Sequence, residues 1–170
     1  MGAEVDAEDD VPWLSSAEQR EWQALMDLQM TLLPALDAQL KRDAGVNVFE
    51  YLVLAYISGT PDRTMVLSEL AAQSRGSLSR LSHAVTRLER AGWVERRTCV
   101  ERGGRRTEAR LTEAGFAKIV EIAPGHVREA RRLVVDVLTP EQLEALGEAA
   151  RAITAAIARA AEGCAGPPDC

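Results

Sequence analysis

Residues 67–97 read LSELAAQSRGSLSRLSHAVTRLERAGWVERR, and their spacing predicts two helices joined by a tight turn. The first is the short LSELAAQ run, for which Ser68 is the expected N-cap. SRG, residues 74–76, forms the turn, Ser77 begins the second helix, and Gly92 ends it in the left-handed conformation that glycine favours. The expected buried stripe of the second helix is Leu78, Leu81, Val85 and Leu88. A short helix, a glycine-containing turn and an amphipathic helix indicate a helix-turn-helix.

A β-hairpin is predicted directly after this unit. WVERRTCV (93–100) favours one strand and RRTEARL (105–111) favours another, with the glycine-rich turn between them. A hairpin in this position is a wing, the loop that a winged helix extends beside its helix-turn-helix. The arginines expected at the tip are Arg105 and Arg106.

The charge distribution singles out the same region. The whole chain carries a net charge of −6, but residues 68–115 hold ten arginines against six acidic residues, which makes this block +4. Arginine is the residue that best makes paired hydrogen bonds to phosphate and to guanine. Double-stranded DNA is therefore the expected partner of this block.

Long helices are expected on both sides of the block. Upstream, a helix capped by Ser15 or Ser16 runs to about Asp43 with a kink at Pro34, and a second spans about 48–58. Downstream, Thr112 caps one long helix through Leu138, which Pro124-Gly125 bends. Thr139-Pro140 then starts a last helix. Its apolar stripe is Leu143, Leu146, Ala150, Ile153 and Ile157.

The expected fold is mainly α with a small antiparallel β-hairpin. Residues 60–111 form the winged helix-turn-helix lobe, and long helices lie at 15–59 and 112–162. An acidic disordered segment is expected at 1–14 and a flexible tail at 163–170. Because exposed Leu and Ile stripes are costly in water, the terminal helices must either cover the lobe of their own chain or pair with those of a second chain. The second arrangement is the expected one, and it gives a homodimer.

The expected DNA contacts lie on the helix-turn-helix and the hairpin tip. Arg80, near the start of the second helix, is expected to contact a base edge or its phosphate in the major groove. Arg105 or Arg106 would enter the adjacent minor groove. The full expected set is Ser68, Arg75, Ser77, Ser79, Arg80, His83, Arg87, Arg105 and Arg106.

Other classes of function find little support. Two histidines and three scattered cysteines give no zinc spacing and no disulfide framework, and no catalytic motif is present, so neither metal, cofactor nor enzymatic activity is expected. The chain shows neither a signal peptide nor an apolar run long enough for a membrane span, so we expect no membrane association and a cytoplasmic location. A winged helix that docks proteins instead of DNA remains an alternative.

Over roughly residues 16–160 the chain resembles the MarR-type transcriptional regulators, which are dimeric winged-helix proteins. The resemblance rests on the 67–97 run, on Leu88-Glu89-Arg90-Ala91-Gly92 and on Leu111-Thr112-Glu113-Ala114-Gly115. It implies a DNA-binding repressor, or less often an activator, that responds to a small ligand or an oxidant. One departure is that Gly103-Gly104 stands where relatives usually keep an Asp that holds the tip arginine, with Glu101 or Glu108 as the nearest acid.

The resemblance also suggests where a signal would act. Related regulators often bind aromatic acids or phenols between the dimer helices and the DNA-binding lobe. The residues that could line such a cleft here are Trp22, Met26, Gln29, Tyr51, Tyr56 and His126. The alternative is redox sensing through Cys99 in the first hairpin strand, where Arg96, Arg97 and Arg102 could lower the pKa of its thiol.

Overall fold

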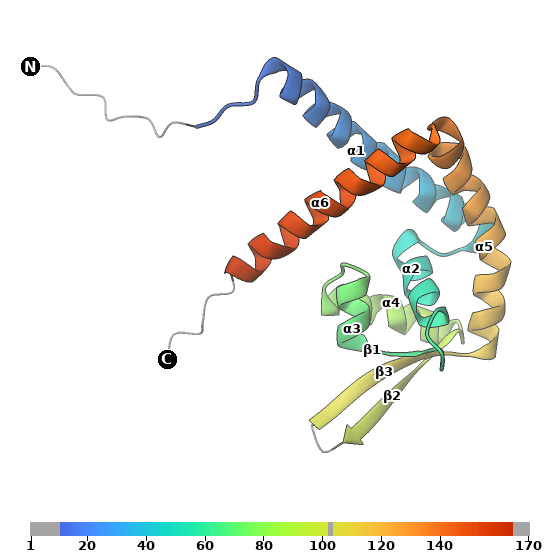
Figure 1. The fold of residues 1–170 in the computed structure, drawn as a ribbon. Helices are drawn as coiled ribbons and strands as arrows, with labels where there is room; N and C mark the ends of the chain where they lie inside the picture. Colours follow the sequence, from blue (N-terminus) through green and yellow to red (C-terminus); the bar gives the residue numbers. More distant parts are fainter. Residues whose placement is uncertain (1–10, 102–103, 165–170) are drawn as a thin grey trace, which may run out of the picture.

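The computed structural model describes residues 11–101 and 104–164 (Figure 1). Residues 99–101, 104–105 and 162–164 are described by their backbone alone. The predicted disordered segment (1–14) and tail (163–170) therefore lie largely outside the described residues. The last helix continues to Cys164, two residues beyond the predicted boundary.

Two helices precede the arginine-rich block. α1 spans Ser16–Ala44 and remains one helix through Pro34. Ser15 caps it in a capping box, because its hydroxyl accepts from the Glu18 backbone N–H while the Glu18 carboxylate accepts from the Ser15 N–H. α2 spans Val48–Ser58, as predicted.

The predicted helix-turn-helix is present as α3, Leu67–Gln73, and α4, Leu78–Arg90. The prediction that Ser68 caps α3 was wrong, because the preceding strand turns straight into the helix at Val66 and no side chain caps it. Leu78 was wrongly placed in the buried stripe of α4. It is the first residue of the helix and 61% exposed, because the packing around α4 starts only at Leu81. Gly92 has the expected positive φ of 75°.

The predicted hairpin is part of a three-stranded antiparallel sheet. β2 (Val94–Glu101) and β3 (Gly104–Leu111) form the wing, and β1 (Thr64–Val66) pairs with the other edge of β3, giving the order β1-β3-β2. Three residues are too few to show an alternating pattern, so the sequence did not predict β1. In Figure 1 the β2–β3 hairpin projects away from the helices.

The helix predicted from residue 113 to 138 is shorter in the structure. α5 spans Glu113–Leu133, and a 3₁₀ turn, η1, covers Val135–Val137. Val134 lies outside helical geometry at φ −131°, in a run of β-branched residues that weakly disfavours helix. α6 then spans Pro140–Cys164. The Thr139 side chain accepts from the Gln142 N–H, as its predicted role as N-cap requires.

The hydrophobic core lies in the winged helix-turn-helix lobe, between the sheet and α2, α3, α4 and the start of α5. A second, smaller cluster of Leu40, Val46 and Ile122 packs α1 against α5. α6 makes few contacts with other elements, and its Ile153 and Ile157 are 45% and 65% exposed. The lobe is thus held rigid by its own core, whereas α6 leaves apolar surface open.

Candidate nucleic-acid interface

The start of α4 presents polar side chains to solvent. Ser77 caps the helix, and its hydroxyl accepts a hydrogen bond of 3.1 Å from the Arg80 N–H. Ser77, Ser79, Arg80 and His83 are all exposed, as is Ser68 on α3. Arg75, in the turn between the helices, has a positive φ of 52°. The structure therefore leaves the predicted contact residues of the helix-turn-helix open to solvent.

Two arginines of α4 contact side chains of α2. The Arg80 guanidinium carbon lies 4.2 Å from the centre of the Phe49 ring, a cation–π contact. Arg87 Nε lies 2.9 Å from Glu50 Oε1, at ion-pair distance but without the direction of a hydrogen bond. The Glu50 side chain is only 3% exposed, whereas that of Arg87 is 63% exposed. Each arginine is thus held at one point while remaining open to solvent.

A third arginine ties the wing to α4. Arg96 on β2 donates from Nη2 to the Ser82 carbonyl (2.7 Å) and to the Thr86 hydroxyl (2.8 Å). Its Nη1 lies 3.3 Å from Glu89 Oε2. The Arg96 guanidinium therefore holds β2 against α4.

The wing positions its arginines by strand register. Arg105 pairs with Val100 and Arg106 with Cys99 across the hairpin, and Arg106 is exposed. The side chains of Arg105 and Cys99, and the tip residues 102–103, lie outside what the structure describes. Glu108, one of the two acids near the tip, sits across from Arg97.

A cleft of about 730 Å³ lies between the α1–α2 corner and the helix-turn-helix. Its apolar lining comes from Leu33, Val48, Phe49 and Leu52. Its cationic lining is Lys41, Arg75, Arg80 and Arg87, against the carboxylates of Asp37 and Glu50. Four basic groups against two acidic ones, above an apolar wall, suit a small molecule that is both apolar and anionic.

The six residues suggested for a ligand cleft lie elsewhere. None of them appears in the lining of the cleft described above, and Trp22 is 52% exposed on α1. Tyr51 and His126 do meet, with ring centres 4.3 Å apart. Burial raises the pKa of Tyr51 and lowers that of His126, whose Nδ1 lies 3.5 Å from Gln39 Oε1. These rings therefore join α1, α2 and α5.

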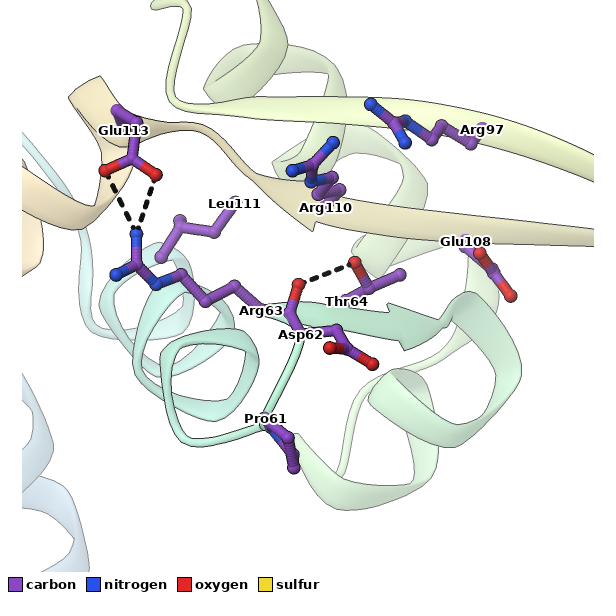
Figure 2. Close-up of a pocket in the computed structure, with 9 residues that line it drawn as sticks. All are labelled: Pro61, Asp62, Arg63, Thr64, Arg97, Glu108, Arg110, Leu111 and Glu113. Atoms are coloured by element: carbon purple, nitrogen blue, oxygen red, sulfur yellow. Dashed lines mark hydrogen bonds and ion pairs between the residues drawn. The ribbon is translucent and has the colours of Figure 1, made fainter.

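A second pocket, of about 550 Å³, opens on the outer side of the sheet (Figure 2). Arg63 donates to the Glu113 carboxylate at 3.0 Å, as the figure shows, and its guanidinium also stacks 3.6 Å from the Phe116 ring centre. The other charged lining residues are Asp62, Arg97, Glu108 and Arg110. Three arginines and three carboxylates balance, and Arg63 fastens the α2–β1 loop to α5. This pocket therefore has a clear structural role at the base of the wing.

Sequence reasoning missed three residues of this interface: Phe49, Glu50 and Arg96. In the sequence, Phe49 is an apolar residue of the 48–58 helix, and Asn47-x-x-Glu50 is a recognisable capping box. Neither pattern indicates that these residues contact Arg80 and Arg87 on α4, which lie about 30 residues or more further along the chain. In the described part of the chain, no group of three or more His, Cys, Asp or Glu could hold a metal ion, and no helix has the length and apolarity to cross a membrane.

Comparison with solved structures gives clear relatives. The chain is 40% identical to Sco3205, a MarR family transcriptional regulator from Streptomyces coelicolor solved in complex with DNA, with a TM-score of 0.81. That match covers 85% of this chain and 94% of the other. AbsC, a MarR family transcriptional regulator from the same organism, is 34% identical over 85% of this chain and 97% of its own, with a TM-score of 0.79.

A more distant likeness shows the fold alone. PcaV, a transcriptional regulator from Streptomyces coelicolor solved with its natural ligand, is 17% identical, with a TM-score of 0.68 over 85% of this chain and 98% of its own. No family model and no curated protein sequence matches the chain.

Proposed function

This chain belongs to the MarR family of transcriptional regulators, which are not enzymes, and we propose that it is a homodimeric repressor that binds a pseudo-palindromic operator. The observation that carries the proposal is the exposed polar start of α4, with Arg80 beside the helix-turn-helix turn. In this arrangement α4 enters the major groove and the wing reaches the adjacent minor groove. The DNA complex of the 40% identical relative supports it.

The dimer is proposed from the exposed apolar faces of the long helices. On α6, Leu146, Ile153 and Ile157 are 37%, 45% and 65% exposed, and on α1 Leu28 and Leu33 are 39% and 57% exposed. Burying each such side chain is worth about 1.5–3 kcal/mol. A two-fold pair would place two copies of α4 roughly 34–36 Å apart, one turn of DNA.

The proposed signal is a small aromatic acid or phenol that releases the protein from DNA. The 730 Å³ cleft offers an apolar wall and an excess of basic groups, and three of those groups, Arg75, Arg80 and Arg87, are themselves expected DNA contacts. A carboxylate or phenolate bound there would compete with phosphate for the same arginines. Salicylate and benzoate are suitable probes. The fraction of protein bound to DNA is expected to fall as the concentration of either compound rises.

DNA binding by the full-length protein tests the proposal. The probe is a duplex from upstream of its own gene, and affinity is followed by fluorescence anisotropy at several salt concentrations. Arg80→Ala is expected to cost about 1–3 kcal/mol of binding free energy and to blur sequence preference. Arg90→Ala, which removes the same charge from the last turn of α4, is the matched control and should lose far less. Absence of binding to every upstream fragment would favour a protein-docking winged helix instead.

A further inference from the structure

Phe49 and Glu50 are adjacent residues in the first turn of α2, and each holds one arginine of α4. From this geometry we infer that both are positioning residues for DNA binding, which fix Arg80 and Arg87 in the orientation that meets the duplex. The inference rests on the proposed function. It adds two residues that neither the charge pattern nor the helix-turn-helix motif identifies.

The Phe49 ring is itself fixed in place. It is 6% exposed, and a Cβ added at Gly76 would lie 2.6 Å from its Cζ and 2.7 Å from its Cε2. The α3–α4 turn therefore closes against one part of the ring, while Arg80 stacks over the ring face. The Phe49 ring is therefore a rigid platform for Arg80, and it belongs to the same lobe as the α3–α4 turn.

Stacking leaves the hydrogen-bonding groups of Arg80 available. A guanidinium carries five N–H donors, and the contact of its carbon with an aromatic ring pairs none of them with a hydrogen-bond acceptor. Within the described residues, the Arg80 guanidinium makes no hydrogen bond, and the residue is exposed. The ring thus restrains a flexible side chain without occupying the edge that would pair with a base or a phosphate.

Glu50 restrains Arg87 for a different reason. Its Oε2 accepts from the Asn47 N–H at 3.0 Å, while its Oε1, buried without a hydrogen bond, has Arg87 Nε 2.9 Å away. A buried carboxylate without a countercharge is costly, so Arg87 is kept beside it. The contact is made by Nε, and the Arg87 side chain as a whole stays 63% exposed.

Fixing a long side chain before binding removes an entropic cost. Ordering one rotamer-rich side chain at an interface costs about 0.5–1.5 kcal/mol. Loss of the platform should therefore weaken DNA binding about two- to ten-fold, by the conversion of 1.4 kcal/mol per factor of ten. This size lies below that expected for removing Arg80 itself.

A double-mutant cycle tests the inference. Phe49→Leu is measured alone and in an Arg80→Ala background by anisotropy on the upstream duplex, after circular dichroism has shown a folded protein. Phe49→Leu alone should bind about two- to ten-fold more weakly, and in the Arg80→Ala background it should change affinity less than about two-fold. Ile57→Val, another buried substitution on α2, is the control and should leave affinity unchanged.

Glu50→Gln gives an independent arm, which also decides the question if Phe49→Leu does not fold. Gln keeps an oxygen for the capping bond with Asn47 but loses the charge that holds Arg87. Because one acidic charge is lost, the readout is the ratio of affinity for the upstream duplex to affinity for an unrelated duplex of equal length. This ratio should fall in the wild-type background and stay constant with Arg87→Ala.

The outcomes separate the two proposals. Wild-type protein that binds no upstream duplex contradicts the proposed function. Wild-type binding that Arg80→Ala weakens, combined with equal losses from Phe49→Leu in both backgrounds, would overturn the role of Phe49, because a merely structural loss adds to the other instead of disappearing. An unchanged affinity ratio for Glu50→Gln would likewise overturn the role of Glu50.

Discussion

Arginines that lie close to one another in this protein have different roles. Arg80 and Arg87 are exposed, and each makes one contact with α2. The Arg96 guanidinium instead contacts Ser82, Thr86 and Glu89 of α4. Arg63, which lies just before the +4 block, also has a structural contact, because it stacks on Phe116 and pairs with Glu113. The +4 block of the sequence is therefore not a uniform DNA-binding surface, because some of its positive charge holds the lobe together.

His126 is expected to make folding stability depend on pH. Burial lowers its pKa below the ordinary 6.5, so the unfolded chain takes up its proton at a higher pH than the folded chain does. Above about pH 6.5 both states are neutral and the residue is without effect. As the pH falls from there through the lowered pKa, the free energy of unfolding should decrease.

Urea unfolding at about pH 7.5 and about pH 5.5 measures this effect. His126→Phe keeps a ring against Tyr51 but cannot be protonated, so the loss of stability on acidification should be smaller in the variant. His83 is present in both proteins and cancels in the comparison. Parallel pH profiles for wild type and variant would contradict a lowered pKa of His126 in the folded protein.

At the scale of elements, local signals located most helices and strands, and long-range pairing supplied the rest. The capping boxes at Ser15 and Asn47 and the caps at Ser77, Thr112 and Thr139 mark helix starts as their sequences indicate. β1 exists because β3 offers its free edge, with Met65 opposite Ala109. That pairing partner is over 40 residues away, so no local pattern could show it.

Two glycines of α5 should respond in opposite ways to the same substitution. A Cβ at Gly115 would lie 2.0 Å from the Trp93 carbonyl oxygen, which is backbone and cannot move aside cheaply. Gly115→Ala is therefore expected to lower the free energy of unfolding by about 1–3 kcal/mol. At Gly125 the nearest atom would be Gln39 Nε2 at 3.6 Å, an ordinary contact. Gly125→Ala should stabilise the helix by about 0.5–1 kcal/mol.

Urea denaturation of the two single variants beside wild type gives both values. Because both glycines lie in the same helix, each serves as the other's control for a general effect of alanine. Equal stability of Gly115→Ala and wild type would show that α5 does not approach the Trp93 backbone, just before β2, as closely as the structure has it.

For the molecule as a whole, the arrangement separates a packed lobe from open helices. α2, α3, α4 and the sheet share one core, and α1 joins α5 through a small second cluster. α6 leads away from the end of α5 with little support from its own chain (Figure 1). A second copy that covers α6 and α1 is the proposed completion of the fold.

A charge placed in the α6 stripe should disrupt the proposed dimer. Ile153→Asp is expected to shift the protein from twice the mass of one chain toward a monomer in light scattering after size exclusion, because a carboxylate cannot be buried there without a partner. Ala152→Asp adds the same charge one position away, off the Leu143–Ile157 stripe, and should leave the mass unchanged. A wild-type protein that is monomeric at micromolar concentration would contradict the dimer.

The sequence by itself determined the features that depend on near neighbours in the chain. These are the helix-turn-helix, the hairpin, the helix caps and the concentration of arginine between residues 68 and 115, since caps, periodicity and turns act over three or four residues. Only the tertiary structure decided which arginines stay open and what holds them. Phe49 meets Arg80, Glu50 meets Arg87 and Arg96 meets α4 because packing brings together side chains that are remote or unrelated in sequence. Burial of one charge then dictates the position of another, and that dependence arises only once the core has formed.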